Sequence, residues 1–191
     1  MIRSSFLVLA SVFLIVGCQS QSSSSSSSPP PAPAVAATPL GPTIRIDAGS
    51  DEPYTDAQGN VWLADTGFDG GDTSQRDADM PIANTKDPGL FRTEHYGMDS
   101  FSYKLPNGKY LVKLYFCETY DGISGPGDRV FSFNVQGQDA TDFDIWAKTG
   151  GAQRPDIETY NVNVTDGELK ITFTPKADNP EINAIEIIPQ G

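Results

Sequence analysis

The sequence predicts an all-β fold, an antiparallel β-sandwich with long loops at one rim. Three observations lead to this prediction. Apolar and polar residues alternate with a period of two in several short segments, as in strands that bury one face. Turn sequences rich in Gly and Asn separate these segments at short intervals. No segment carries a sustained apolar stripe of helical period with capping residues.

Seven strands are expected, and two of the turns between them are indicated by dipeptides that favour tight turns. Asn107-Gly108 and Asp166-Gly167 each lie between two such segments, and both dipeptides tolerate positive φ, so each predicts a hairpin. Segment 130–135 places Phe131, Phe133 and Val135 on one face. The predicted strands are residues 43–47, 101–105, 110–116, 130–135, 160–164, 169–173 and 182–188.

Two long loops are the first places to look for a functional site. Residues 64–89 are rich in Asp and Gly, and residues 118–128 follow a predicted strand. Loops of a sandwich gather at its rim, and a loop as long as the first usually has a function. A ligand site is therefore expected where these loops meet.

The N-terminal residues predict export and lipid anchoring. Residues 1–17 combine one cation, Arg3, with an apolar run too short to span a bilayer, as in a secretory signal peptide. The run ends Leu14-Ile15-Val16-Gly17-Cys18, which resembles a bacterial lipobox and implies lipidation of Cys18. An ordinary signal peptide with an incidental cysteine is the alternative. Acyl chains on Cys18 would hold the protein on a membrane.

A tether is expected between the lipid anchor and the domain. Residues 18–42 contain seven consecutive serines followed by Pro-rich sequence, a composition that cannot bury a core. The domain is assigned to residues 43–191 and is expected to face the periplasm or the cell exterior. In a Gram-negative cell, Gln19 after the cysteine favours the outer membrane.

Composition narrows the function classes. The formal net charge is −12, so repulsion makes nucleic acid an unfavourable partner, although acidity also serves simple solubility. Cys117 has no disulfide partner within the domain and is expected to be a small buried hydrophobe. With one histidine, His95, and no Gly-x-Ser-x-Gly, His-Glu-x-x-His or Cys-x-x-Cys motif, no enzymatic activity is predicted.

Other function classes remain open at this stage. A glycosidase needs two carboxylates that converge with separated pKa values, whereas dense loop aspartates are usually solvated. A structural or adhesive surface protein that binds a protein partner is the main alternative. No cofactor is expected, apart from a possible structural calcium ion held by oxygens of the first long loop, Asp69, Asp72, Asp77 and Asp79.

Six segments in the same order resemble the malectin family of carbohydrate-binding modules. The similarity covers residues 43 to 188, which is the whole predicted domain, and implies a jelly-roll-like, galactose-binding-like sandwich. The segments are Ile46-Asp47-Ala48-Gly49, Phe91 to Tyr96 with Phe101 to Pro106, Gly108 to Tyr120, Arg129 to Gly137, Asp142 to Trp146 and Asp178 to Ile185.

The resemblance implies a cleft for glucosyl or galactosyl saccharides, lined by aromatic rings and an aspartate. Its residues match Tyr96, Tyr120 and Asp178, with Phe68 and Asp121 expected to flank them. Asp121 stands where the animal lectin has an aromatic residue, and only Phe68 is near the place of an earlier tyrosine. Part of the aromatic lining is therefore missing or rebuilt. Each of the three main residues also has a structural alternative: packing for the tyrosines, and capping of the turn before Pro180 for Asp178.

Overall fold

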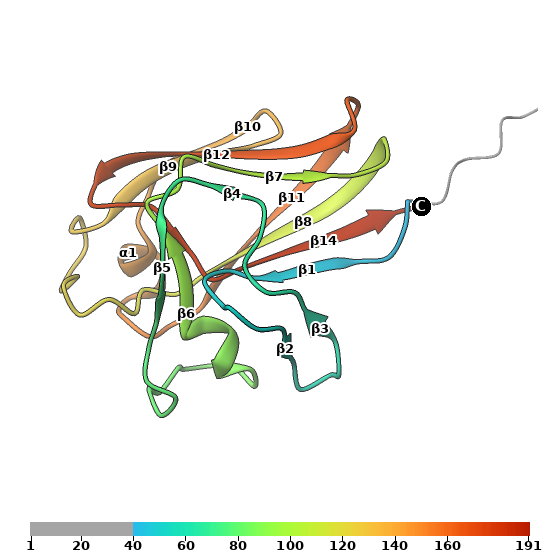
Figure 1. Cartoon of the computed structure of the whole chain (residues 1–191). Helices are drawn as coiled ribbons and strands as arrows, with labels where there is room; N and C mark the ends of the chain where they lie inside the picture. Colours follow the sequence, from blue (N-terminus) through green and yellow to red (C-terminus); the bar gives the residue numbers. More distant parts are fainter. Residues whose placement is uncertain (1–39) are drawn as a thin grey trace, which may run out of the picture. The chain divides into compact units, whose positions relative to one another are not determined.

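Residues 40–191 are described by a computed structural model, in which two antiparallel sheets pack face to face (Figure 1). One sheet has the order β1 (Ile44–Asp47), β14 (Ala184–Gln190), β8 (Gly108–Phe116), β11 (Asp156–Val164). The other has the order β10 (Gln138–Phe143), β9 (Val130–Val135), β12 (Glu168–Ala177), β7 (Ser100–Lys104), β4 (Phe68–Asp69). The predicted antiparallel sandwich is confirmed.

The core lies between these two sheets and follows from alternation along their strands. In β9 the buried residues are Phe131, Phe133 and Val135, the three that the sequence placed on one face. Phe116 of β8 packs against Phe131 and Phe133 from the opposite sheet, with ring centroids 6.1 and 5.6 Å apart. Each aromatic side chain of this size buries a large apolar area.

Both predicted hairpins are wrong. The strands on either side of Asn107-Gly108 belong to different sheets, and so do the strands on either side of Asp166-Gly167. Each dipeptide turns the chain across the sandwich. The two turns bond to each other, because Gly167 N donates to Asn107 Oδ1 at 2.8 Å and Asn107 Nδ2 donates to the Thr165 carbonyl at 2.9 Å. Turn chemistry predicted a reversal but not the partner strand.

A smaller three-stranded sheet lies at one end of the sandwich and forms one wall of the candidate site. It consists of β13 (Glu181–Ile182), β6 (Thr93–Tyr96) and β5 (Asp72–Gln75) in that order. The long segment 64–89 therefore contains β4 and β5. Buried Asn183 ties β6 to the main sheet, since its Nδ2 donates to the Thr93 carbonyl at 2.7 Å.

Short elements complete the described part of the chain. They are the pair β2 (Tyr54–Thr55) and β3 (Val61–Trp62), the 3₁₀ helix η1 (Pro88–Phe91) and helix α1 (Ile145–Thr149). Among residues 40–191, no helix has the length and apolar character that crossing a membrane requires. The predicted signal peptide, the predicted lipidation site Cys18 and most of the predicted tether lie outside the described residues.

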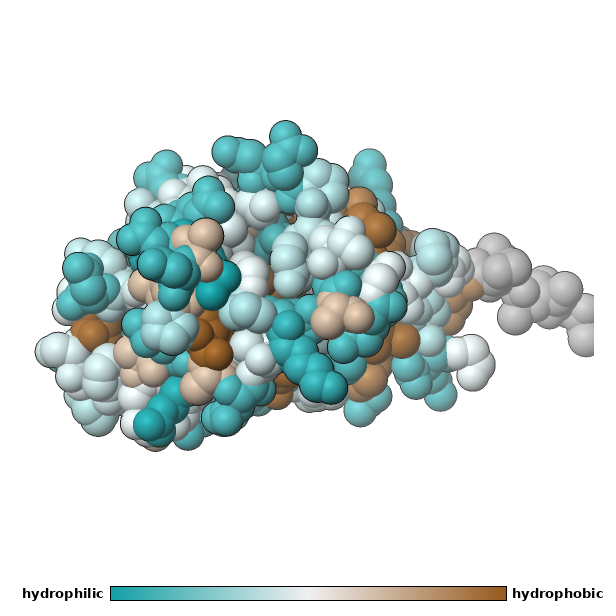
Figure 2. Space-filling view, turned by 90° about the horizontal axis from the view of Figure 1, so that it is seen from below, coloured by the Kyte–Doolittle hydropathy of each residue, from teal (hydrophilic) through white to brown (hydrophobic). Residues whose placement is uncertain are grey.

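The surface carries many hydrophilic side chains. The face shown in Figure 2 is mainly hydrophilic, and its apolar side chains form small separate patches. Small patches of this kind are ordinary on soluble domains.

Candidate functional site

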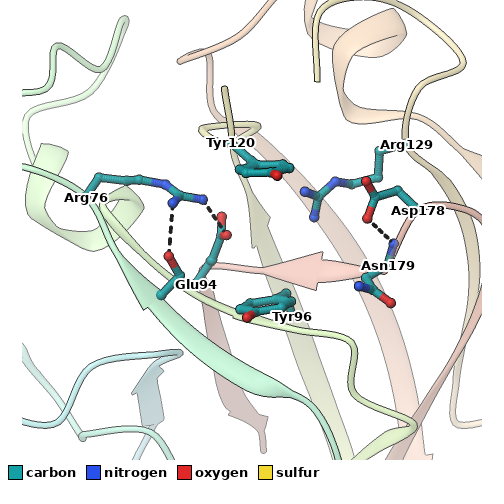
Figure 3. A pocket seen from close by; sticks show the side chains of 8 residues that line it. Arg76, Glu94, Tyr96, Tyr120, Arg129, Asp178 and Asn179 are labelled. Carbon is teal, nitrogen blue, oxygen red and sulfur yellow. Dashed lines mark hydrogen bonds and ion pairs between the residues drawn. The ribbon is translucent and has the colours of Figure 1, made fainter. Parts of the chain in front are cut away.

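A cavity of about 250 Å³ opens between the three-stranded sheet and the loop that follows β8 (Figure 3). Three of the five predicted binding residues, Tyr96, Tyr120 and Asp178, meet there although they come from separate parts of the chain. The lining residues are Ser74, Arg76, Glu94, Tyr96, Tyr120, Arg129, Asp178 and Asn179.

Tyr96 ends the central strand of the small sheet. It is paired with Asp72 of β5 on one side and with Glu181 of β13 on the other. Gly71, with a φ of +83°, allows this arrangement, because a Cβ at Gly71 would collide with the Tyr96 carbonyl oxygen. The Tyr96 backbone is therefore held from both sides, and its side chain lines the pocket.

Tyr120 projects from the loop after β8 and is 42% exposed, as a ring that receives a ligand must be. Its backbone N–H donates to Glu118 Oε1 at 3.0 Å. The ring lies against Gly122, where a Cβ would overlap it. The Arg76 guanidinium carbon lies over the ring, 5.7 Å from its centroid and within cation–π range.

Asp178 caps the turn before Pro180 and also lies at the pocket. Its Oδ1 accepts a hydrogen bond from the Asn179 backbone N–H at 2.6 Å, which fixes the turn before Pro180. The residue has a φ of +56°, a conformation that Asp tolerates better than most residues. It also lines the pocket, at its exposed rim.

The other two predicted residues do not line the pocket. Phe68 stacks on His95, with ring centroids 4.2 Å apart and planes inclined by 22°, and it packs against the core. Asp121 is exposed in the turn after Tyr120. Phe68 was expected at the site because it lies in the predicted loop 64–89. That part of the loop forms strand β4, which directs Phe68 to the core and not to the pocket.

His95 holds the segment between β3 and β5 in place. Its Nδ1 is 3.0 Å from Asp65 Oδ1, and its Nε2 is 2.9 Å from the Gly70 carbonyl. Because both nitrogens face acceptors, the doubly protonated ring satisfies both contacts. Burial by itself lowers the pKa of His95, but the hydrogen bonds to Asp65 and Gly70 and the Asp65 charge together raise it.

Three charged pocket residues were not singled out from the sequence: Arg76, Glu94 and Arg129. Arg76 Nη2 lies 2.6 Å from Glu94 Oε1, and Arg129 Nε lies 2.9 Å from Glu118 Oε2. Glu94 and Arg129 are nearly fully buried at 3% and 4% exposure. Their neighbours in the sequence are mostly polar, so no local pattern marked them as buried; buried charges are rare unless paired, and the pairs form only in the fold.

Beneath the pocket floor lies a cluster of acids, Glu94, Glu118 and Glu181. Glu181 is fully buried, and no side chain donates a hydrogen bond to it in residues 40–191. Burial and the neighbouring charge of Glu94 raise its pKa well above the ordinary value, although Arg129 opposes this. Burial also raises the pKa of Glu118 despite the Arg129 charge. Burial therefore favours the neutral form of Glu181.

A metal-ligand cluster and an activated thiol are two kinds of reactive group to consider among the described residues. In residues 40–191, no three His, Cys, Asp or Glu side chains are grouped so as to hold a metal ion. Cys117 is buried, and burial together with nearby Glu181 raises the pKa of its thiol far above neutrality. A thiol in that state is a poor nucleophile.

Sequence comparison identifies relatives that share this domain. The family described as "Malectin domain" matches residues 43–185. Malectin-B of Xenopus laevis is 32% identical over 129 residues, covering 57% of this chain and 46% of that protein. The kinesin-like protein KIN-14R of Arabidopsis thaliana is 30% identical over 130 residues, covering 65% of this chain and 12% of that protein. The chain thus spans about half the length of the Xenopus relatives.

Solved structures share the fold at lower sequence identity. A β-glucuronidase of Bacteroides uniformis superposes with a TM-score of 0.69 at 20% identity, covering 78% of this chain and 18% of that enzyme. The plant receptor-like kinase FER superposes with a TM-score of 0.68 at 21% identity, covering 78% of this chain and 49% of that chain. At these identities the likeness establishes the sandwich fold alone.

Proposed function

Because this chain belongs to the malectin domain family, we propose that it is a non-catalytic carbohydrate-binding protein whose ligand lies in the pocket between Tyr96 and Tyr120. The observation that carries the proposal is the convergence of two tyrosines and one aspartate from three separate segments. Glucosyl- or galactosyl-containing oligo- or polysaccharide is the proposed ligand class.

The chemistry of a pyranose ring suits this pocket. A sugar has an apolar face of C–H groups, which a tyrosine ring can cover at low entropic cost, and an edge of hydroxyls. Asp178 and Asn179 offer acceptors and donors for that edge. A volume of about 250 Å³ is small for a ligand pocket and fits one or two sugar units. A dissociation constant between about 1 μM and 1 mM is therefore expected.

The absence of catalysis is part of the proposal. Support comes from the pairing of the pocket's charged groups: Glu94 is engaged by Arg76, and the Asp178 carboxylate by the Asn179 backbone. A general acid and a nucleophile both need a free carboxyl group beside the scissile bond.

Membrane anchoring through Cys18 is also proposed, with the domain outside the cytoplasm. Such a protein would hold polysaccharide near the cell surface. Radiolabelled palmitate incorporation into the full chain, with a Cys18→Ser control, tests the anchor separately from the ligand. A protein-binding surface role is the competing function, and the sugar-binding experiment distinguishes the two.

Replacing Tyr120 by Ala is expected to weaken saccharide binding by about 1 to 3 kcal/mol, by analogy with base stacking on aromatic side chains. Tyr120→Phe keeps the ring and should retain most of the affinity. Calorimetric titration of residues 40–191 with a panel of neutral and acidic oligosaccharides measures both effects. A folded Tyr120→Ala protein with unchanged affinity would place the ligand elsewhere, and no response to any sugar would favour the protein-binding role.

A further inference from the structure

Arg129 has donor capacity that the protein itself does not use. Its side chain is only 5% exposed, and its Nε contacts Glu118. Its Nη1 is buried, and no partner for it exists among residues 40–191. Figure 3 shows the guanidinium directed toward the pocket below the Tyr120 ring. A buried donor without an acceptor costs free energy, which a ligand acceptor would recover.

Arg76 brings a second guanidinium to the opposite side of the pocket (Figure 3). Its Nη1 donates to Ser74 Oγ at 2.9 Å and its Nε to Thr119 Oγ1 at 3.2 Å, in addition to the pair with Glu94. These bonds fix its orientation. Tyr120 therefore lies between two immobilised cations, an environment that attracts a negatively charged group.

The nearby carboxylates weaken this attraction but leave the Nη1 donor of Arg129 without an acceptor. Glu94 and Glu118 each pair with one arginine, and burial favours the neutral form of Glu181 by raising its pKa. Asp178 is the remaining acid of the lining, but it is exposed at the rim, where water and salt weaken its repulsion. The buried Arg129 guanidinium acts at a lower dielectric, so its electrostatic effect on a ligand group beside it is larger than that of the exposed Asp178 carboxylate.

This inference rests on the proposed function and specifies its ligand. We propose that the bound saccharide carries a carboxylate, as uronic acids do, and that Arg129 is the residue that selects it. A planar carboxylate matches the fork of a guanidinium with two parallel hydrogen bonds, whereas a hydroxyl takes only one. The two tyrosines then hold the sugar ring while Arg129 binds its acid group.

Methyl esterification of the sugar tests the proposal without altering the protein. Trimers of galacturonate and of glucuronate are compared with their methyl esters by calorimetric titration of residues 40–191 at pH 7, in 50 and 300 mM salt. At least one acid is expected to bind about tenfold or more tightly than its ester, since a charge-assisted hydrogen bond is roughly twice as strong as a neutral one. Its affinity should fall at the higher salt concentration, whereas that of the ester should not.

The outcomes separate this inference from the proposed function. Esters or neutral sugars that bind as tightly as the acids overturn the carboxylate assignment and leave carbohydrate binding intact. If no sugar of either kind binds, both proposals fail. An acid preference that persists in a folded Arg129 variant would assign the selection to another residue.

Two Arg129 variants complete the test, because removing this arginine alone would leave Glu118 buried without a partner. Arg129→Lys keeps the charge but lacks the fork. Arg129→Met combined with Glu118→Gln removes both charges together. In each, the ratio of acid to ester affinity is expected to fall toward one, with folding checked by thermal unfolding. An equal loss for acid and ester would indicate a purely structural role for Arg129.

Discussion

The domain is expected to become more stable as the pH is lowered from 8 to about 5, the reverse of ordinary acid denaturation. Asp47 is 2% exposed, and burial raises its pKa from 3.8 to about 7, although the Thr93 hydroxyl donates to it at 2.7 Å and opposes the rise. Between these values the folded carboxyl is protonated while the unfolded one is ionised. Unfolding therefore releases a proton, and stability falls as the pH rises through this window.

The size of the effect follows from the difference between the two pKa values. Over the full interval from 3.8 to about 7, Asp47 alone accounts for about 4 kcal/mol, and the part between pH 5 and about 7 accounts for about 3 kcal/mol. Glu118, Glu181 and His95 also have raised pKa values and act in the same direction, each above its own ordinary value. The lowered pKa values of Asp56 and Asp128 oppose this only at more acidic pH.

Urea unfolding at pH 5, 7 and 8.5 measures this dependence. Asp47→Asn keeps an acceptor for Thr93 but cannot ionise, so this variant should be more stable than the wild type at pH 8.5 and should depend less on pH. Asp51→Asn is the matched control, because it removes the same charge from a side chain that is exposed and not buried. Parallel pH profiles for wild type and Asp47→Asn would show that Asp47 does not carry the effect.

The sandwich was predictable because one-sided burial imposes a period of two. The β9 residues Phe131, Phe133 and Val135 show this directly, since alternation alone places all three in the core. Strand pairing was not predictable in the same way. A turn such as Asn107-Gly108 fixes where the chain reverses, whereas membership of a sheet depends on contacts made by residues far along the chain.

Only part of the candidate site was predictable, because some of its residues depend on contacts between distant segments. Tyr96, Tyr120 and Asp178 came from a resemblance of ordered segments, and the structure brings them into one pocket. Phe68 was expected beside them because of its place in a loop, but its stacking on His95 depends on a contact across the chain. Arg129 escaped notice because only its three-dimensional burial reveals an unused donor.

Gly49→Ala is expected to destabilise the fold by about 2 to 5 kcal/mol. Gly49 has a φ of +81°, and its N–H donates to Asp65 Oδ1 at 2.7 Å. A left-handed backbone costs a non-glycine residue about 1 to 2 kcal/mol. A Cβ at this position would also lie closer than 3.0 Å to backbone atoms of Glu94, and overpacking adds about 1 to 3 kcal/mol.

Gly59→Ala separates these two contributions. Gly59 has nearly the same φ, +83°, but a Cβ there would meet no atom within 4 Å. Its substitution should therefore cost only the backbone part, and the difference between the two variants in urea unfolding isolates the collision with β6. Since Glu94 holds Arg76 at the pocket, a displaced β6 should also weaken saccharide binding in Gly49→Ala and not in Gly59→Ala. Equal destabilisation of both variants would mean that β6 moves aside freely, and that the pocket wall is less rigid than its pairing with β5 and β13 implies.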